Sequence, residues 1–413
     1  MIELAFEEEK QTASGVNLKV MGIGGAGGNA VNSMIAGGDL TSVHFAVANT
    51  DAQALELSSA SCKIQLGKQI TKGLGAGSNP EVGRKSAEED LNAILDVLAN
   101  TDILFLTAGL GGGTGSGALP VVVQAAKDLG ILTIVVVTKP FLFEGKRRKQ
   151  HAEEALKNVE GVADTLIVVP NQRLIEISDP NISMLNAFAL SNDILKQAIK
   201  GISDIITKAG HINVDLADVK TIMKDTGFAI MGTGRASGPD RARKAALHAI
   251  SSPLIENTDI QGAKGVLINI TGNQDLGLQE INEAASMVYD MVNPDATIIL
   301  GSVIDASAGD EICITIIATG LGSAEEKQPG KTVMVAASKP AVVEEVFVAE
   351  EKTSNEELAI AKPATTVVEE PKQVAAAETA EEEHLDLDDL DTPTFMRKKA
   401  LGEDAKAEGS DQL

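Results

Sequence analysis

Two glycine-rich segments carry the residues best suited to chemistry in this sequence. The first glycine segment, VMGIGGAGGNAV (Val20–Val31), leaves an apolar run and enters a stretch with helical periodicity. A turn of this kind directs backbone N–H groups and the positive end of a helix toward one point, which suits a phosphate group. Glycine is needed there because a Cβ would hold the phosphate away from the backbone, and because some positions require positive φ.

The first glycine segment alone leaves several interpretations open. Gly22, Gly24 and Gly27 satisfy GxGxxG, and Asp51 follows the next apolar run, as it would in a dinucleotide-binding fold. The segment therefore suits NAD, a nucleoside triphosphate, or only a tight turn between a strand and a helix.

The second glycine segment, GGGTGSG (Gly111–Gly117), favours a nucleoside triphosphate. It again follows an apolar run and precedes a helical stretch, so the chain has two phosphate cradles where a dehydrogenase needs one. The hydroxyl groups of Thr114 and Ser116 add donors where a P-loop has lysine. The sequence contains neither GxxxxGK[ST] nor NKxD, which excludes Walker-type and Ras-type NTPases at the level of motifs.

The elements that must position these segments follow from the apolar pattern between about Asn17 and Val137. Short apolar runs bounded by Gly, Asn or Lys-Pro indicate buried strands, and amphipathic stretches alternate with them. Such alternation predicts an α/β fold with a parallel sheet and helices on both faces. The predicted strands are Leu18–Gly22, Val43–Ala48, Ile103–Thr107, Ile131–Thr138 and Thr165–Pro170; the predicted helices are Asn29–Ala36, Ser86–Leu98 and a third with Pro120 in its first turn.

A long helix leads into a second, smaller module. Ser183 to about Lys208 has helical periodicity, which corresponds to roughly 39 Å of helix, and Gly210 is expected to stop it. The rest, up to about Leu321, is expected to form a smaller α+β domain. Its predicted strands are Phe228–Gly232, Gly265–Thr271, Ala296–Val303 and Glu311–Thr319; its predicted helices are Asp218–Lys224, Arg241–Ile250 and Leu278–Met291.

Charge and cysteine content exclude several functional classes. The net charge of −24 argues against a nucleic-acid binder with a broad basic face. Cys62 and Cys313 have neither CxxC spacing nor a histidine cluster, as expected for two buried thiols of a reducing cytoplasm rather than a metal site. The N-terminus is acidic, unlike a signal peptide, and no apolar run approaches the roughly 18 residues of a membrane span. A cytoplasmic protein that contacts a membrane only indirectly is expected.

Half of the net charge lies at the C-terminal end. From Leu321 onward there are 22 acidic and 10 basic residues, a difference of −12. Residues 322–384 are expected to be a disordered acidic linker, because ordering a residue costs about 1–2 kcal/mol and this composition buries too little to offset that. Leu385–Ala400 places apolar residues between an acidic and a basic run, which is typical of a short motif that folds on a partner; random tail sequence is the alternative. Residues 1–16 are expected to be flexible and residues 401–413 to be a variable tail.

GGGTGSG matches the tubulin signature, and the chain resembles the FtsZ family, the bacterial cell-division relatives of tubulin. The resemblance covers about Asn17 to Leu321 and the C-terminal motif. It implies a Rossmann-like GTP-binding domain (17–182), a central helix (183–210) and a C-terminal domain (211–321) that begins with a catalytic loop. It also implies GTP or GDP with Mg²⁺ as ligands, and head-to-tail polymerisation into a ring at the mid-cell division site.

The resemblance further assigns contacts to the nucleotide. KPFLFEGKRR resembles the ribose-side motif, with Glu144 holding hydroxyl groups and Arg148 facing phosphate, although Lys146–Lys149 also suit a solvated helical face. ALSND resembles the guanine-reading segment: Asp193 would accept from the base N1–H and 2-amino group, and Phe188 would lie against the ring. The implied phosphate contacts are Gly25, Ala26 (where the family often has glycine), Gly27, Gly28, Asn29, Gly112, Gly113, Thr114 and Gly115.

The loop HINVDLADV (His211–Val219) contains an acidic pair, Asp215 and Asp218, at the start of a predicted helix. Taken alone, the pair is explained by N-capping. In the family this loop reaches the nucleotide of the next subunit, where its carboxylates orient or deprotonate the attacking water. General-base catalysis of this type accelerates a reaction by about 10²–10⁴. The resemblance therefore implies that Asp215 and Asp218 are catalytic and that the site is complete only in the polymer.

The C-terminal motif resembles the FtsZ peptide that binds the membrane-linked, actin-like FtsA and other division proteins. Phe395 and Met396 would enter a groove, and Arg397–Lys399 would meet acidic residues. Two rival hypotheses remain. One is an NAD(P)-dependent oxidoreductase built on GxGxxG and Asp51; the other is a tubulin-like regulator that binds GTP without hydrolysis or polymerisation, against which the acidic pair argues.

Overall fold

A ten-stranded sheet forms the framework of the computed structural model, which describes residues 15–321 except 180, 209, 211, 253 and 256–259. The expected linker (322–384), the C-terminal motif (Leu385–Ala400) and the tail (401–413) lie outside the described residues, as do the first 14 residues. Among the described residues, no helix is long and apolar enough to cross a membrane.

The first six strands of the sheet are parallel and follow the order β3-β2-β1-β4-β5-β6. The strand order therefore reverses between β1 and β4, and a crevice for ligands forms at the carboxyl ends of strands at such a point. Gly22 on β1 lies opposite Thr107 on β4, and Ile23 opposite Ala108, so both glycine segments leave the sheet side by side. The strands are β1 (Leu18–Ile23), β2 (Val43–Asn49), β3 (Cys62–Gln65), β4 (Ile103–Gly109), β5 (Leu132–Lys139) and β6 (Thr165–Pro170).

The second half of the chain continues the same sheet. β7 pairs in parallel with β6 only from Thr165↔Gly227 to Ile167↔Ala229, and β10 is antiparallel to both β7 and β8. The predicted α/β fold with a smaller α+β part is confirmed, and a short ladder joins the two parts into one sheet. The strands are β7 (Gly227–Ser237), β8 (Gly265–Gly272), β9 (Thr297–Ile304) and β10 (Glu311–Thr319).

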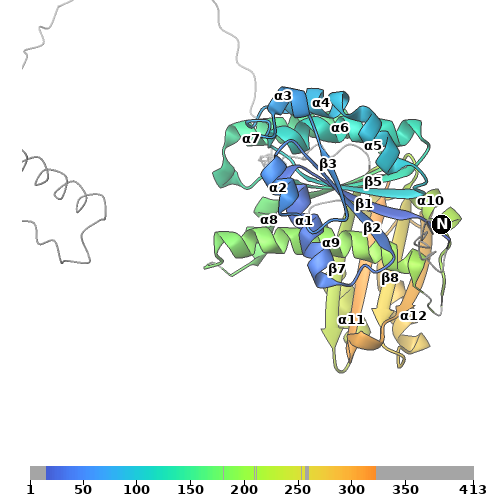
Figure 1. Ribbon diagram of the computed structural model, residues 1–413. Helices are drawn as coiled ribbons and strands as arrows, with labels where there is room; N and C mark the ends of the chain where they lie inside the picture. Colours follow the sequence, from blue (N-terminus) through green and yellow to red (C-terminus); the bar gives the residue numbers. More distant parts are fainter. Residues whose placement is uncertain are drawn as a thin grey trace, which may run out of the picture. The chain divides into compact units, whose positions relative to one another are not determined.

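Helices cover both faces of the parallel strands, as the alternating pattern predicts. Figure 1 shows α1 (Gly24–Gly37) and α9 (Met184–Thr207) on one side, and α4, α5 and α6 on the other. Aliphatic side chains fill a separate core on each side, and a third core packs α11 and α12 against β8 and β10. The other helices are α2 (Ala52–Glu56), α3 (Lys68–Thr71), α4 (Pro80–Glu89), α5 (Leu91–Leu98), α6 (Gly113–Asp128), α7 (Lys146–Val159), α8 (Asn171–Ile177), α10 (Leu216–Met223), α11 (Arg241–Ile250) and α12 (Leu278–Tyr289).

Several local predictions are wrong. The predicted helix over Ser86–Leu98 is two helices, α4 and α5, which meet at Asp90, where a side-chain oxygen accepts from the Gly67 N–H at 2.7 Å. Pro120 lies in the interior of α6, because that helix begins within the second glycine segment. Cys62 and Cys313 are free thiols, but both are only partly buried. β3 and the short helices α2, α3 and α8 were not predicted.

Gly210 does not end α9 in the predicted way. The helix ends at Thr207, and Lys208 at its C-cap is extended, with φ −99° and ψ 138°. Glycine is nevertheless required at position 210, because an added Cβ would lie 1.5 Å from the Ser302 carbonyl oxygen on β9. The residue is thus a point of close backbone approach rather than a left-handed helix cap.

Close backbone contact also fixes the start of α6 against α4. An added Cβ on Gly83 would lie 2.3 Å from the Gly113 carbonyl oxygen, and one on Gly117 would lie 1.9 Å from the Pro80 carbonyl oxygen. Both obstacles are backbone atoms, which cannot turn aside as a flexible side chain can. The glycines of the second segment therefore position α6 as well as exposing its N–H groups.

Replacing Gly117 with alanine tests this packing. Because the new methyl group meets the Pro80 carbonyl, we expect Gly117→Ala to lower the free energy of unfolding by about 1–3 kcal/mol, the usual effect of overpacking. Urea denaturation followed by circular dichroism measures the change. Gly262→Ala is the matched control, since nothing lies within 4 Å of its added Cβ; an equal loss in both variants would contradict the packing argument.

Candidate nucleotide-binding site

The two glycine segments touch each other at the carboxyl ends of β1 and β4. Gly24 has φ +73°, and a Cβ added there would lie 2.9 Å from the backbone nitrogen of Gly115. A Cβ added to Gly109, at the end of β4, would lie 2.5 Å from the Cβ of Ala26. The structure thus brings together the two segments that the sequence places almost ninety residues apart.

The glycines of these segments fall into two groups. Those packed against protein atoms include Gly27, whose Cβ would lie 2.5 Å from the Thr107 carbonyl oxygen, and Gly115, at 2.6 Å from the Gly109 carbonyl oxygen. By contrast, a Cβ on Gly25, Gly28 or Gly112 would meet nothing within 4 Å. Packing does not require glycine at these three positions, so their open sides leave room for a ligand close to the backbone.

Both helices that begin at the glycine segments lack a side-chain cap. The N-cap residues are Ile23 for α1, whose side chain is apolar, and Gly112 for α6, which has no side chain; neither first turn contains an acidic residue. The neighbouring helices differ, because Asp51 caps α2 and Asn79 caps α4. The first N–H groups of a helix have no partner within the helix. Two adjacent helix ends of this kind form a binding site for an anion.

The side chains of the second glycine segment stabilise its conformation. Thr114 Oγ1 lies 2.7 Å from Thr50 Oγ1 in a buried hydrogen bond, and Ser116 Oγ accepts from the Gly111 N–H at 2.8 Å. Both side chains are therefore held in place by the protein. The Ser116 hydroxyl accepts in this contact and keeps its own proton as a donor, so the segment offers backbone N–H groups and this hydroxyl as donors.

Glu144 and Arg148 lie beside the second glycine segment. Glu144 ends the 3-10 turn η1 (Leu142–Glu144), and its carboxylate binds Arg148 Nη1 at 2.6 Å and accepts from the Phe141 N–H at 2.9 Å. The Glu144 side chain is 13% exposed and that of Arg148 is 48% exposed. A Cβ on Gly111, where φ is +100°, would lie 2.8 Å from the Arg148 carbonyl oxygen, which shows the direct contact with the glycine segment.

Phe188 joins this group from the first turns of α9. Its ring packs edge-on against Phe141, with centroids 5.2 Å apart, and 6.5 Å from Phe143, while 37% of the residue stays exposed. Asp193 lies further along α9 and is exposed. Between them Ser191 donates to Asn171 Oδ1 at 2.8 Å, which ties this part of α9 to the start of α8.

The acidic pair lies at the other end of α9. Asp215 caps α10 and accepts from the Asp218 N–H at 2.8 Å, while Asp218 accepts from the Asp215 N–H at 3.2 Å. Nineteen residues of helix separate Phe188 from Thr207, or about 28 Å, and Figure 1 shows α10 beyond the end of α9 that lies away from α8. The acidic pair therefore caps α10, as the capping interpretation predicts. It lies far from the glycine segments of the same chain.

Two family models match the chain over most of the described residues. The model described as "Tubulin/FtsZ family, GTPase domain" matches residues 17–179, and the one described as "FtsZ family, C-terminal domain" matches residues 227–322. A curated relative, the cell division protein FtsZ of Pseudomonas aeruginosa, is 46% identical over 96% of this chain and 100% of its own length. The chain belongs to the FtsZ family of cell-division GTPases.

Other relatives and solved structures agree with this FtsZ assignment. The cell division protein FtsZ of Coxiella burnetii is 50% identical over 77% of this chain and 82% of its own length. A structure described as an empty FtsZ dimer from M. jannaschii has a TM-score of 0.71 and 41% identity, and the match covers 74% of this chain and 89% of that one. CetZ2 from Haloferax volcanii, in a GTPγS-bound protofilament, has a TM-score of 0.64 at 21% identity over 75% of this chain and 95% of that one, which shows a shared fold.

Membership in the FtsZ family also decides against the oxidoreductase hypothesis. Asp51, on which that hypothesis was built, is the N-cap of α2: its Oδ1 accepts from the Gln53 N–H at 2.9 Å and the Ala54 N–H at 3.2 Å. Sequence reasoning missed Thr50, Phe141 and Asn171, whose contacts with the site come from distant parts of the chain. The two phenylalanines of KPFLFEGKRR were a usable signal, because aromatic residues make up only 2% of the sequence.

The division between packed and open glycines predicts how substitutions in the two segments act. Gly25→Val should leave the melting temperature nearly unchanged but weaken GTP binding about tenfold or more, or about 1.4 kcal/mol, because its side chain enters the open space. Isothermal titration of nucleotide-free protein measures the affinity. Ala26→Gly is the control and should bind as tightly as the unsubstituted chain. Equal affinity in Gly25→Val would place the phosphates elsewhere.

Proposed function

We propose that this chain is a GTP-dependent, polymerising GTPase of bacterial cell division, whose active site forms between successive subunits of a head-to-tail filament. One observation carries the proposal. The uncapped starts of α1 and α6 and the acidic pair lie toward opposite ends of α9 in one chain. Only a second copy can bring these two halves of a hydrolytic site together.

The nucleotide is held by the residues around the crevice. Backbone N–H groups of the first turns of α1 and α6 bind the phosphates, using Gly25 to Asn29 and Gly112 to Gly115. Glu144 holds the ribose hydroxyl groups, and Arg148, placed by its ion pair with Glu144, faces the phosphates. Asp193 selects guanine because adenine lacks the pair of donors that a carboxylate accepts from, and Phe188 presents its exposed ring to the base.

Mg²⁺ accompanies the nucleotide in this proposal. Among the described residues, no group of three or more His, Cys, Asp or Glu side chains is arranged to hold a metal ion. Mg²⁺ commonly retains several waters and binds through phosphate oxygens rather than an all-protein cage. The ion would therefore be bound chiefly through the nucleotide, and when bound it would neutralise phosphate charge.

Hydrolysis depends on the acidic pair of the adjacent subunit. Each carboxylate uses one oxygen in the capping interaction, and among the described residues the other oxygen makes no further hydrogen bond. Those oxygens are free to orient or deprotonate the attacking water, a contribution of about 10²–10⁴ in rate. Assembly therefore activates hydrolysis, and the resulting GDP weakens the filament.

An apolar patch beside the nucleotide supports a subunit contact at this face. Four large side chains around Phe188 are between 60 and 78% exposed. Met184 and Leu185 precede Phe188 by one helical turn and share its side of α9, while Phe143 packs against its ring. Exposed apolar groups of this kind indicate an interaction surface. The four residues are Leu142, Phe143, Met184 and Leu185.

The remaining parts of the proposal concern organisation and partners. The boundaries are those implied by the family: a GTP-binding domain (17–182), a central helix (183–210) and a C-terminal domain (211–321). Leu385–Ala400 recruits FtsA and other division proteins through Phe395 and Met396, so the filament reaches the inner face of the membrane at mid-cell only indirectly. Nucleic acid has no part in this function.

Mixing two inactive variants tests the shared active site. Asp215→Asn keeps a cap for α10 but removes the charge, and its turnover should fall about tenfold or more while GTP affinity stays unchanged. Gly25→Val binds GTP more weakly but keeps the acidic pair, and turnover is measured at a GTP concentration that leaves its own site mostly empty. An equimolar mixture should recover up to about a quarter of the full turnover, the share of random head-to-tail contacts that join the two intact halves.

The recovered turnover is measured as the rate of phosphate release, with the same total protein concentration in the mixture and in each single variant. Mixing Asp215→Asn with Asp215→Asn,Gly25→Val is the control and should recover nothing. A mixture of the two single variants that stays as inactive as its components would contradict a site shared between subunits.

The C-terminal motif predicts a separation of functions. A chain that lacks Leu385–Leu413 should keep its turnover, because it retains residues 15–321, but should no longer bind FtsA on vesicles. Co-sedimentation with FtsA-coated vesicles measures recruitment. Retained binding by the shortened chain would remove the motif from partner recognition.

A further inference from the structure

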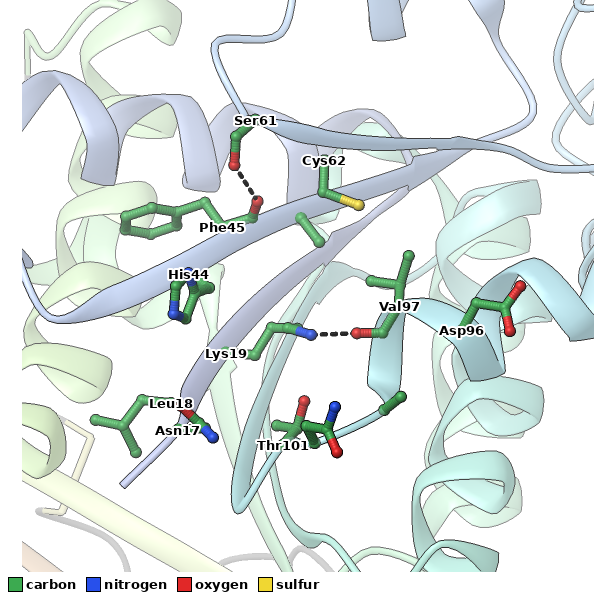
Figure 2. A pocket seen from close by; sticks show the side chains of 13 residues that line it. Asn17, Leu18, Lys19, His44, Phe45, Ser61, Cys62, Asp96, Val97 and Thr101 are labelled. Carbon is green, nitrogen blue, oxygen red and sulfur yellow. Dashed lines mark hydrogen bonds between the residues drawn. The ribbon is translucent and has the colours of Figure 1, made fainter. Parts of the chain in front are cut away.

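A cavity of about 380 Å³ lies at the amino ends of the strands whose carboxyl ends carry the glycine segments. Residues of β1, β2 and β3 line it, together with the end of α5 and the turn before β4 (Figure 2). Its volume falls in the range of small-molecule sites, about 300–1,000 Å³. The length of β1, about 20 Å at 3.3 Å per residue, separates this cavity from the nucleotide site.

Lys19 supplies a cation to the cavity. It is the second residue of β1, lies opposite His44 on β2, and donates to the Val97 carbonyl oxygen at the end of α5. Burial lowers the pKa of Lys19. No carboxylate among the described residues forms an ion pair with it, although the exposed Asp96 also lines the cavity. An ammonium group has three donors, so Lys19 can bind further acceptors.

Thr101 supplies a hydroxyl group to the same cavity. The residue is 9% exposed, and its buried Oγ1 has no hydrogen-bond partner among the described residues. The adjoining Asp102 is firmly placed, because the Asn17 N–H donates to Asp102 Oδ2 at 2.8 Å and the Asp102 N–H donates to the Asn17 carbonyl oxygen at 3.0 Å. Buried polar groups are normally paired, and one that is not requires an explanation.

We propose that this cavity binds a small anionic metabolite through one carboxylate or phosphate group, which accepts from Lys19 Nζ and Thr101 Oγ1. A single anionic group matches the single lysine, and Asp96 at the cavity disfavours a ligand of high negative charge. His44, which is exposed, lies next to Lys19 as a further donor. The site is independent of the nucleotide and belongs to the same chain.

Cys62 provides a local reporter of occupancy. Its partner on β2 is Ala46, and Figure 2 shows its thiol on the same side of the sheet as Lys19. Cys62 is free, and it lines the same cavity as Lys19. The only other cysteine, Cys313, has a pKa raised by burial and is expected to react slowly. A bound anion should therefore slow the alkylation of Cys62.

The test measures alkylation of Cys62 by iodoacetamide in the full chain saturated with GDP, at constant ionic strength. Inorganic phosphate and acetate are the two probes, and peptide mass spectrometry separates Cys62 from Cys313. We expect at least one probe to slow the reaction saturably, by about fivefold or more when the site is mostly filled. The stronger probe identifies phosphate or carboxylate as the preferred group. No saturable protection by either probe would overturn the proposal.

Variants assign the protection to the cavity. Lys19→Met and Thr101→Val should each abolish the protection of Cys62. Lys63→Met is the control and should retain the protection. Lys63 adjoins Cys62 but is exposed, and its amino group donates to the Glu56 carbonyl oxygen at 3.2 Å. GDP affinity shows whether each variant is folded. If Lys19→Met does not fold, the nearly isosteric Thr101→Val variant tests the assignment. Full protection in a folded Lys19→Met or Thr101→Val variant would overturn the assignment.

Discussion

The contact between Gly24 and Gly115 is the constraint on which the rest of the site depends. It exists because β1 and β4 are parallel neighbours in register, so that two helices begin at the same edge of the sheet. Neither helix start is capped by a side chain, and their positive ends lie close together. Such an arrangement leaves N–H groups unsatisfied until an anion binds. In the proposed function, phosphate affinity is thus a property of the backbone and of the absence of side chains, rather than of a lysine.

In the proposed function, the length of α9 makes catalysis depend on assembly. Its first turns carry Phe188 and Asp193, and α10 with the acidic pair follows its far end. Buried contacts hold the helix rigidly in place: Asn269 on β8 donates to the Gly201 carbonyl oxygen at 2.9 Å, and a Cβ on Gly301 would lie 2.2 Å from Ile205 Cδ1. A rigid helix of about 36 Å cannot bend the acidic pair toward the phosphates of its own chain. In the proposed function this separation links catalysis to filament formation.

The sequence predicted the sheet better than the helix starts. The bounds of β6, β10 and α11 agree with the prediction, because apolar runs and turn residues mark them locally. Glycine is a poor helix former, so the sequence did not indicate that α1 and α6 begin inside the glycine segments. Tertiary contacts, such as that of Gly117 with Pro80, determine those starts. The break at Asp90, the contact of Gly210 with Ser302 and the pairing of Thr50 with Thr114 likewise depend on residues distant in sequence.

GTP turnover per molecule as a function of protein concentration tests the central claim most directly. If the active site forms only between subunits, turnover should be close to zero at concentrations where sedimentation shows monomers, and should rise steeply above a threshold at which filaments pellet. A turnover per molecule that stays constant down to the monomeric range would show that one chain carries the complete site, and would contradict this account.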